Sequence, residues 1–283
     1  MKKRLLIENI FIYLFLGVIF VITAFPLVYT VASSFKTNME IMAEPARVFP
    51  AAPTLENYVT VWTDPAFNAG LMGLNSLYYT LANVLIAVVT ASMGGYVFAR
   101  GRFPFKRLIF GCFISLMFIK VGNIGIYATF QVLGLLRLDR SLPALILLNV
   151  FGVPIVNVYL VRGYVSTIPR AVDEAAKIDG CDFFGIYCRV ILPMLKPILA
   201  TVAILTFQWS WNDYIMPTIF TMTNPKQQTL IVGLMALKSG GGAASSWNLM
   251  LAGSAIALIP VVAAYACAGK YFVSGLAAGA VKE

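Results

Sequence analysis

Long runs of mainly apolar residues constrain the fold of this chain more than any other feature. A helix needs about 20 consecutive apolar residues to cross a bilayer. Runs of that order lie at residues 10–32, 73–99, 108–133, 141–165, 191–222 and 248–275. Charged residues make up only 12% of the sequence, whereas an average soluble domain has about 25%. We therefore predict an all-α polytopic membrane protein with six transmembrane helices.

The positions of Lys and Arg predict the orientation of these helices. Residues 2–4 are basic, and further basic residues lie between the second and third runs and on both sides of residues 169–188. Cytoplasmic loops carry the excess of Lys and Arg, so both termini are expected in the cytoplasm. The first run exceeds the roughly 7–15 apolar residues of a signal peptide, which indicates a retained span. The polar residues 34–70 then form an extracytoplasmic loop.

Composition argues against several other kinds of function. The net charge is +9, but the basic residues are placed beside the apolar runs, so we expect no nucleic-acid partner. The chain has four cysteines and no histidine. Cys112 and Cys267 lie in apolar runs, and Cys181 and Cys188 lie in the segment placed in the cytoplasm. We therefore expect neither disulfides nor a metal site.

A segment that mixes charged and apolar residues, from Pro169 to Pro197, separates the fourth and fifth runs. Pro169 suits a first helical turn, with Ser166 or Thr167 available as its cap, and Gly180 suits a left-handed helix end. Asp182 can cap a second short helix. The segment thus predicts a bent pair of amphipathic helices at 169–188 on the membrane surface. Helices this short must dock on something to be stable.

The fifth run contains a cluster of polar and aromatic residues around Asp213. A carboxylate at membrane depth is costly, so Asp213 should face the bundle interior and have a partner. It could instead lie near the outer interface or cap a helix break before Pro217. Amides suit the hydroxyls of a sugar and aromatic faces suit its apolar side. The candidate pathway residues are Gln208, Trp211, Asn212 and Asp213, with Tyr127 and Lys120 as further candidates.

Several of these patterns resemble one family of transporters. E-A-A-x-x-x-G at residues 174–180, followed by I-L-P at 191–193 and flanked by apolar runs, resembles the coupling loop of ABC importer permeases. W-N-D at 211–213, Y-V-F-A-R at 96–100 and the ending at 271–283 are similar to the MalG-like carbohydrate-importer permeases. The resemblance covers essentially the whole chain. It is specific to the family and not to one sugar.

The resemblance implies an ABC importer type I permease fold. In this reading residues 1–69 form the first transmembrane helix and an extracytoplasmic loop, and residues 70–283 form the five-helix permease core with cytoplasmic coupling helices at 169–188. It also implies a subunit that moves a sugar or oligosaccharide across the bacterial plasma membrane by alternating access. The residues that it implies for coupling to ATPase subunits are Pro169, Glu174, Ala175, Ala176, Asp179, Gly180, Leu192 and Pro193.

The resemblance implies several partners besides membrane lipid. These are a second homologous permease subunit, two ATP-binding cassette subunits and an extracytoplasmic solute-binding protein. ATP and Mg would bind in the cassettes, because this chain has no G-x-x-x-x-G-K-[ST] phosphate loop. The chain itself is therefore expected to hold no cofactor and to be no enzyme.

The third run departs from the family pattern and leaves the solute open. Prolines usual near its outer end are replaced by F-I-K-V-G-N-I-G-I-Y at residues 118–127. Lys120 there could extend its charge to the interface or offer a cation to an acidic sugar. Import of an amino acid or polyamine is an alternative. A stand-alone secondary transporter is another, although it should show several intramembrane acids or an inverted repeat.

Overall fold

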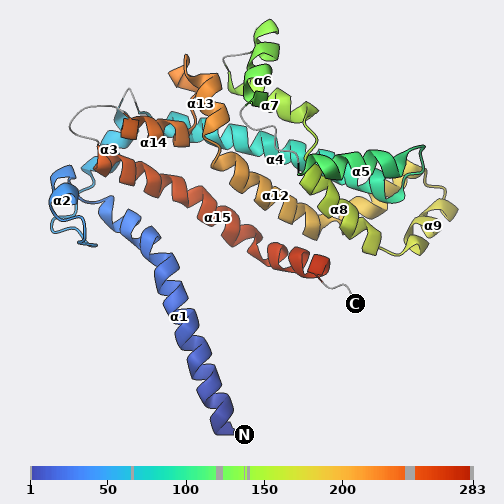
Figure 1. The fold of residues 1–283 in the computed structure, drawn as a ribbon, viewed down its shortest axis with the longest axis horizontal. Coiled ribbons are helices and arrows are strands. Elements are labelled where there is room, and N and C mark those ends of the chain that lie inside the picture. The colour runs from blue at the N-terminus through green and yellow to red at the C-terminus, as the bar shows by residue number, and fades with distance from the viewer. Residues whose placement is uncertain are drawn as a thin grey trace. The chain divides into compact units, whose positions relative to one another are not determined.

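The computed structural model of the chain describes residues 2–64, 67–118, 124–136, 138, 141–239 and 246–280. Every regular element in these ranges is helical (Figure 1). The helices α1 (Lys2–Ser33), α4 (Ala69–Arg100) and α15 (Trp247–Ala280) each contain a stretch long and apolar enough to cross a membrane. The prediction of an all-α membrane protein is confirmed.

Two further apolar stretches are bent helix pairs. The first consists of α7 (Leu142–Phe151) and α8 (Ile155–Thr167), which meet at 44°. Proline at 154 has no N–H for the helical ladder, so the break falls where the sequence places Gly152 and Pro154. In the second pair, Phe183–Met194 meets α12 (Lys196–Trp211) at 76°. The described residues thus contain three candidate spans, or five if each bent pair counts as one.

The remaining predicted runs are divided as well. The run at 108–133 corresponds to α5 (Lys106–Leu116) and α6 (Ile124–Leu135), and residues 119–123 between them lie outside the described part. The run at 191–222 is divided among α11 (Leu192–Met194), α12 and α13 (Ile215–Thr221), and the short break between α12 and α13 contains Asp213. The 3-10 turn η2 (Pro225–Gln227) and α14 (Leu230–Ser239) follow.

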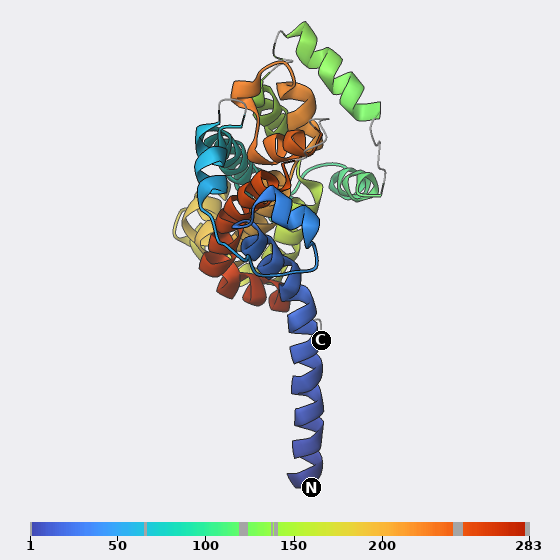
Figure 2. The same ribbon diagram turned by 90° about the vertical axis from the view of Figure 1, so that its left-hand side faces the viewer.

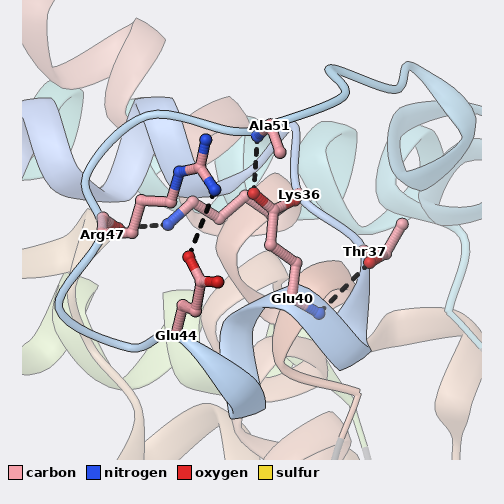
Figure 3. A network of polar contacts seen from close by, with 6 residues as sticks. All are labelled: Lys36, Thr37, Glu40, Glu44, Arg47 and Ala51. Carbon is pink, nitrogen blue, oxygen red and sulfur yellow. Dashed lines mark hydrogen bonds and ion pairs between the residues drawn. The ribbon is translucent and has the colours of Figure 1, made fainter.

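The chain divides into two compact units, and the first comprises residues 1–71 and 233–259. In it, α1 continues unbroken through Pro26 (Figure 2). The short helices α2 (Asn38–Ala43) and α3 (Glu56–Thr63) follow. A polar network holds the intervening loop: buried Lys36 donates to the carbonyl of Arg47, and Glu40 Oε1 accepts from the Ala51 N–H at 2.6 Å (Figure 3).

The second unit comprises residues 72–232 and 260–283 and contains two apolar clusters. One joins α4 and α8 to the segment around residues 176–202. The close approach of α4 to α8 requires Gly95, because a Cβ there would lie 2.6 Å from the side chain of Val161. The other cluster packs Tyr79 of α4 against residues of α6, α7 and α13, including Leu133, Leu142 and Phe220.

Candidate functional site

The first part of the predicted helix pair is α9 (Arg170–Ile178), and its start differs from the prediction. The expectation that Ser166 or Thr167 caps it is wrong, because their hydroxyls donate to carbonyls within α8, those of Arg162 and Tyr164. Pro169 itself occupies the N-cap position. Its extended backbone turns the chain out of α8 and into α9.

The end of α9 follows the prediction for Gly180. This residue has φ of +82°, in the left-handed region that favours glycine. Its N–H donates to the carbonyl of Lys177 at 3.0 Å, and the N–H of Cys181 donates to that of Ala176 at 2.9 Å. These two bonds form a Schellman motif, which satisfies the last carbonyls of the helix. Asp179 is the exposed C-cap residue.

The second part of the pair begins with α10 (Phe183–Ile186). Asp182 caps it as predicted, since its Oδ1 accepts from the Gly185 N–H at 2.8 Å. The π-helical turn η1 (Tyr187–Ile191) and α11 (Leu192–Met194) continue the chain. Leu192 and Pro193 therefore lie just before the 76° bend that redirects the chain into α12.

The two faces of α9 differ in exposure. Glu174 and Ala175 are exposed, but Ala176 is buried and packs in the apolar cluster of its own unit. Of the predicted alanine pair, only Ala175 is accessible to a partner. Sequence reasoning missed Ile178, which is 87% exposed. It follows Glu174 by four residues and Ala175 by three, a spacing that puts all three on one helix face and could have identified it.

The end of α4 is joined to α9 by an ion pair. The Nε of Arg100 lies 2.9 Å from Oδ2 of Asp173, and both side chains are largely buried. The Nη2 of Arg100 also donates to the carbonyl of Ile168 at 2.5 Å. Arg100 belongs to the family pattern Y-V-F-A-R, and Asp173 was not predicted from the sequence as a functional residue. One α4 side chain thus contacts both the residue that ends α8 and the middle of α9.

Two more α4 residues contact the second half of the helix pair. The rings of Tyr96 and Phe183 lie 4.7 Å apart, and the Tyr96 hydroxyl donates to the carbonyl of Phe183 at 3.2 Å. The hydroxyls of Ser92 and Tyr187 are hydrogen-bonded at 2.8 Å. Ser92, Tyr96 and Arg100 recur every four residues, so they share one face of α4. We call these three residues the α4 ladder.

A cavity of about 440 Å³ lies in the second unit beside the break between α7 and α8. Asn149 Nδ2 donates to Asn83 Oδ1 at 2.9 Å, and Asn157 Nδ2 donates to Thr206 Oγ1 at 3.2 Å. The indole of Trp209 lines the same cavity. Among the described residues nothing accepts from Nδ2 of Asn83, although Asn83 is 3% exposed. The cavity wall therefore carries the amide groups of Asn83, Asn149 and Asn157.

Asp213 is connected to this cavity through Tyr79. The Tyr79 hydroxyl donates to Oδ2 of Asp213 at 2.9 Å, so the carboxylate has the interior partner that its depth required. The Tyr79 side chain also lies near Asn83 and Asn149, which line the cavity. A polar chain thus leads from the break between α12 and α13 to the cavity wall.

The other predicted pathway residues lie elsewhere. The Tyr265 hydroxyl donates to Gln208 Oε1 at 2.9 Å, and Asn212 Nδ2 donates to the Gln208 carbonyl at 2.8 Å. Trp211 is only 4% exposed and stacks on Phe207 at 5.7 Å. None of these predicted residues lines the cavity described above.

The two candidates in the third run are not part of this arrangement. Tyr127 is exposed on α6 and accepts a hydrogen bond from Gln131 Nε2 at 2.7 Å. Lys120 lies outside the described residues. Sequence reasoning missed the lining residues Asn83, Asn149, Asn157 and Thr206. No group of three or more Cys, Asp or Glu side chains within the described ranges is placed to hold a metal ion.

Membrane-length helices, bent spans beside a cavity that carries amide groups, and a capped helix pair with an exposed face are features expected of a helical transporter subunit. The chain belongs to the family of binding-protein-dependent transport system inner membrane components, whose model matches residues 6–277. This confirms the predicted family of ABC importer permeases. The chain is a permease subunit, and ATP is hydrolysed by a separate subunit of the transporter.

Two relatives are similar to this chain over nearly their whole length. The galactooligosaccharides transport system permease protein GanQ of Bacillus subtilis is 31% identical, over 100% of this chain and 98% of its own. The arabinooligosaccharides transport system permease protein AraQ of Halalkalibacterium halodurans is 30% identical, over 92% of both chains. The crystal structure of a bacterial ABC transporter involved in alginate import has the same fold, with a TM-score of 0.82 and 22% identity over 96% of this chain and 98% of its own.

Proposed function

We propose that this chain is the permease subunit of an ATP-driven importer that moves a neutral sugar or oligosaccharide across the bacterial plasma membrane. The cavity beside the break between α7 and α8 carries this proposal. Amides both donate and accept hydrogen bonds, as sugar hydroxyls do, and an indole face suits the apolar side of a sugar ring. The named substrates of GanQ and AraQ support the same class of solute.

The lining of the cavity favours a neutral saccharide over an acidic one. Most of the lining is apolar and includes the Trp209 indole, the polar groups are asparagine amides and a threonine hydroxyl, and no charged side chain lines it among the described residues. The polar chain through Tyr79 ends at the carboxylate of Asp213, which would repel an anion. A role for Lys120 in attracting an acidic sugar stays a prediction from the sequence.

The exposed face of α9 would receive the ATP-binding cassettes. Glu174 offers a carboxylate to a basic group, and Ala175 and Ile178 offer a close-packing apolar surface. Closure of the two cassettes around ATP would move the helix pair at 169–188 as one body, and the α4 ladder would pass this motion to α4. Asn83 is on α4, so the movement would bias the cavity between inward- and outward-facing states.

The full transporter would contain partners that complete the path and the energy supply. A second homologous permease would form the other half of the membrane pathway. An extracytoplasmic solute-binding protein would deliver the sugar and set most of the specificity. The two cassettes would bind the ATP and Mg.

The function can be tested with the complete transporter in proteoliposomes. We expect ATP-driven uptake of labelled galactotriose or arabinotriose in the presence of the solute-binding protein. Asn157→Ala should lower uptake at least fivefold, whereas Asn212→Ala, which lies outside the cavity, should leave it unchanged. A loss of uptake in Asn212→Ala alone would move the path to the cluster predicted from the sequence. Uptake of amino acids or polyamines instead of saccharides would refute the proposed solute class.

A further inference from the structure

A second, smaller cavity of about 170 Å³ lies where α4 ends, between the loop at 101–105, the start of α5 and the helix α9. Its lining is rich in cations and contains fewer acids. The cations are Arg100, Arg102, Lys106, Arg170 and Lys177, and the acids are Asp173 and Glu174. The size of this cavity suits a single phosphate-sized group better than a sugar.

The positive charges in this cavity are only partly compensated. Asp173 is engaged with Arg100. The Nζ of Lys106 donates to backbone carbonyls, those of Gly101 at 2.8 Å and Ala99 at 3.3 Å. Its pKa is lowered by burial and by the nearby charges of Arg162 and Arg170. An anion in the cavity would therefore relieve repulsion among cations that are already close together.

Arg162 adds a further positive charge beside this group. Its guanidinium lies 4.0 Å from the centre of the Phe110 ring, a cation–π contact that leaves the charge in place. The ion pairs found among the described residues join Arg100 to Asp173 and Arg47 to Glu44. Glu174 is the remaining carboxylate in the cavity lining, at the edge that the cavity shares with the exposed face of α9.

Two exposed apolar residues, Phe105 and Leu108, lie next to the cavity-lining Lys106 in the sequence, although neither lines the cavity itself. The loop at 101–105 follows α4 directly, and α4 is a candidate span. Phe105 is 74% exposed and Leu108 is 65% exposed. Phe105 has φ of +57°, a left-handed conformation that is uncommon for a residue with a large side chain. An exposed aromatic ring beside a basic cavity at the end of a span matches the boundary between lipid headgroups and acyl chains.

We propose that this cavity binds the headgroup of an anionic phospholipid. Lys106 and Arg170 contact the phosphate, and Phe105 and Leu108 lie against the upper part of the acyl chains. Charge complementarity favours an anion, and the adjacent exposed apolar residues favour a lipid over a soluble acidic segment. Because Arg170 of α9 lines this cavity, the bound lipid would also stabilise the position of the helix pair that faces the cassettes. The inference does not depend on which solute is transported.

Native mass spectrometry of the full chain in detergent can test this proposal. The probes are palmitoyl-oleoyl phosphatidylglycerol and, for comparison, palmitoyl-oleoyl phosphatidylcholine. A basic residue near a membrane surface contributes about fivefold to affinity for anionic lipid. We therefore expect Lys106→Gln with Arg170→Gln to weaken phosphatidylglycerol binding at least tenfold, whereas Lys226→Gln, at η2, should leave it unchanged. Equal binding of the two lipids by the wild type would overturn the proposal.

A second variant distinguishes binding of a lipid from binding of a free phosphate compound. Phe105→Asn keeps a residue that tolerates the left-handed conformation and removes the apolar ring. It should weaken phosphatidylglycerol binding several-fold and leave binding of glycerol 1-phosphate unchanged. Unaltered lipid binding in this variant would contradict the lipid contact. If the Lys106 and Arg170 double variant retained lipid binding but no longer copurified with the cassettes, the cavity would be a protein-docking surface and the proposal would be wrong.

Discussion

The guanidinium of Arg100 lies 2.9 Å from the carboxylate of Asp173, and the two side chains are only 10% and 14% exposed. This ion pair links the last residue of α4 to the middle of α9. Neither residue lines the 440 Å³ cavity beside the break between α7 and α8, and neither belongs to the exposed face of α9 that we assign to the cassettes. Their contact can therefore transmit movement between the α9 surface and the cavity, although neither residue binds the solute or the cassettes.

Removing one partner of this pair should be more damaging than removing both. Arg100→Met or Asp173→Asn leaves the other group buried without its counter-ion, a loss of about 3 kcal/mol in stability. The double variant should recover part of that loss, measured as the apparent Tm of the purified transporter and as uptake per ATP hydrolysed. The exposed pair of Arg47 and Glu44 serves as the control, because breaking it should cost less than about 1 kcal/mol. Additive losses in the double variant would show that the pair does not couple.

Local rules were sufficient to predict the helix pair. Asp182 and Gly180 adopt the cap and the left-handed end expected of them because these roles depend on a few neighbouring backbone groups. Ser166 and Thr167 were mispredicted because α8 extends to Thr167 and its own carbonyls accept their hydroxyls. The burial of Ala176 could not be read from the motif, since it depends on packing with residues distant in the sequence.

Gly180 should be sensitive to side-chain shape even though it has space around it. A Cβ at this position would meet no atom within 4 Å, so any cost comes from the left-handed backbone. Gly180→Val should destabilise the helix pair by about 2 kcal/mol, whereas Gly180→Asn should be nearly neutral. Gly163→Ala in α8, which also has open space, should be neutral or stabilising. Limited proteolysis of the helix pair and copurification with the cassettes would measure these effects. Equal protease sensitivity and equal copurification of Gly180→Val and Gly180→Asn would contradict this account.

The exposed face of α9 should determine the affinity for the cassettes. Burying the Ile178 side chain is worth about 2 kcal/mol, so Ile178→Ser should weaken cassette binding roughly 30-fold without changing the Tm of the isolated chain. Glu174→Lys should weaken it further by reversing a charge. Met39→Ser removes a similarly exposed apolar side chain, 82% against 87%, from the other unit and should have no effect. If both Ile178→Ser and Glu174→Lys assembled and transported normally, the coupling assignment would be wrong.

The cavity could not be predicted from the sequence, because its lining comes from three segments that are far apart in the chain. Asn83, Asn149 and Thr206 are separated by tens of residues and meet only when α4, α7 and α12 pack. Each asparagine looks like an isolated polar residue in an apolar run. The pattern around Asp213 correctly indicated that this carboxylate needs a partner, but could not show that the partner is Tyr79. Adjacent residues in a helix also point in different directions, so the cluster at 208–213 could not line one surface.

Trp209 and Trp211 should respond in opposite ways to the same substitution. Trp209 is 58% exposed and lines the cavity, so Trp209→Ala should reduce saccharide uptake while the apparent Tm changes little. Trp211 is 4% exposed and stacked on Phe207, so Trp211→Ala should leave an internal void that costs about 3 kcal/mol. Uptake per correctly folded transporter should then remain close to that of the wild type. Thermal denaturation and uptake assays on both variants would check this, and a transport defect in Trp211→Ala at unchanged Tm would return Trp211 to the solute pathway.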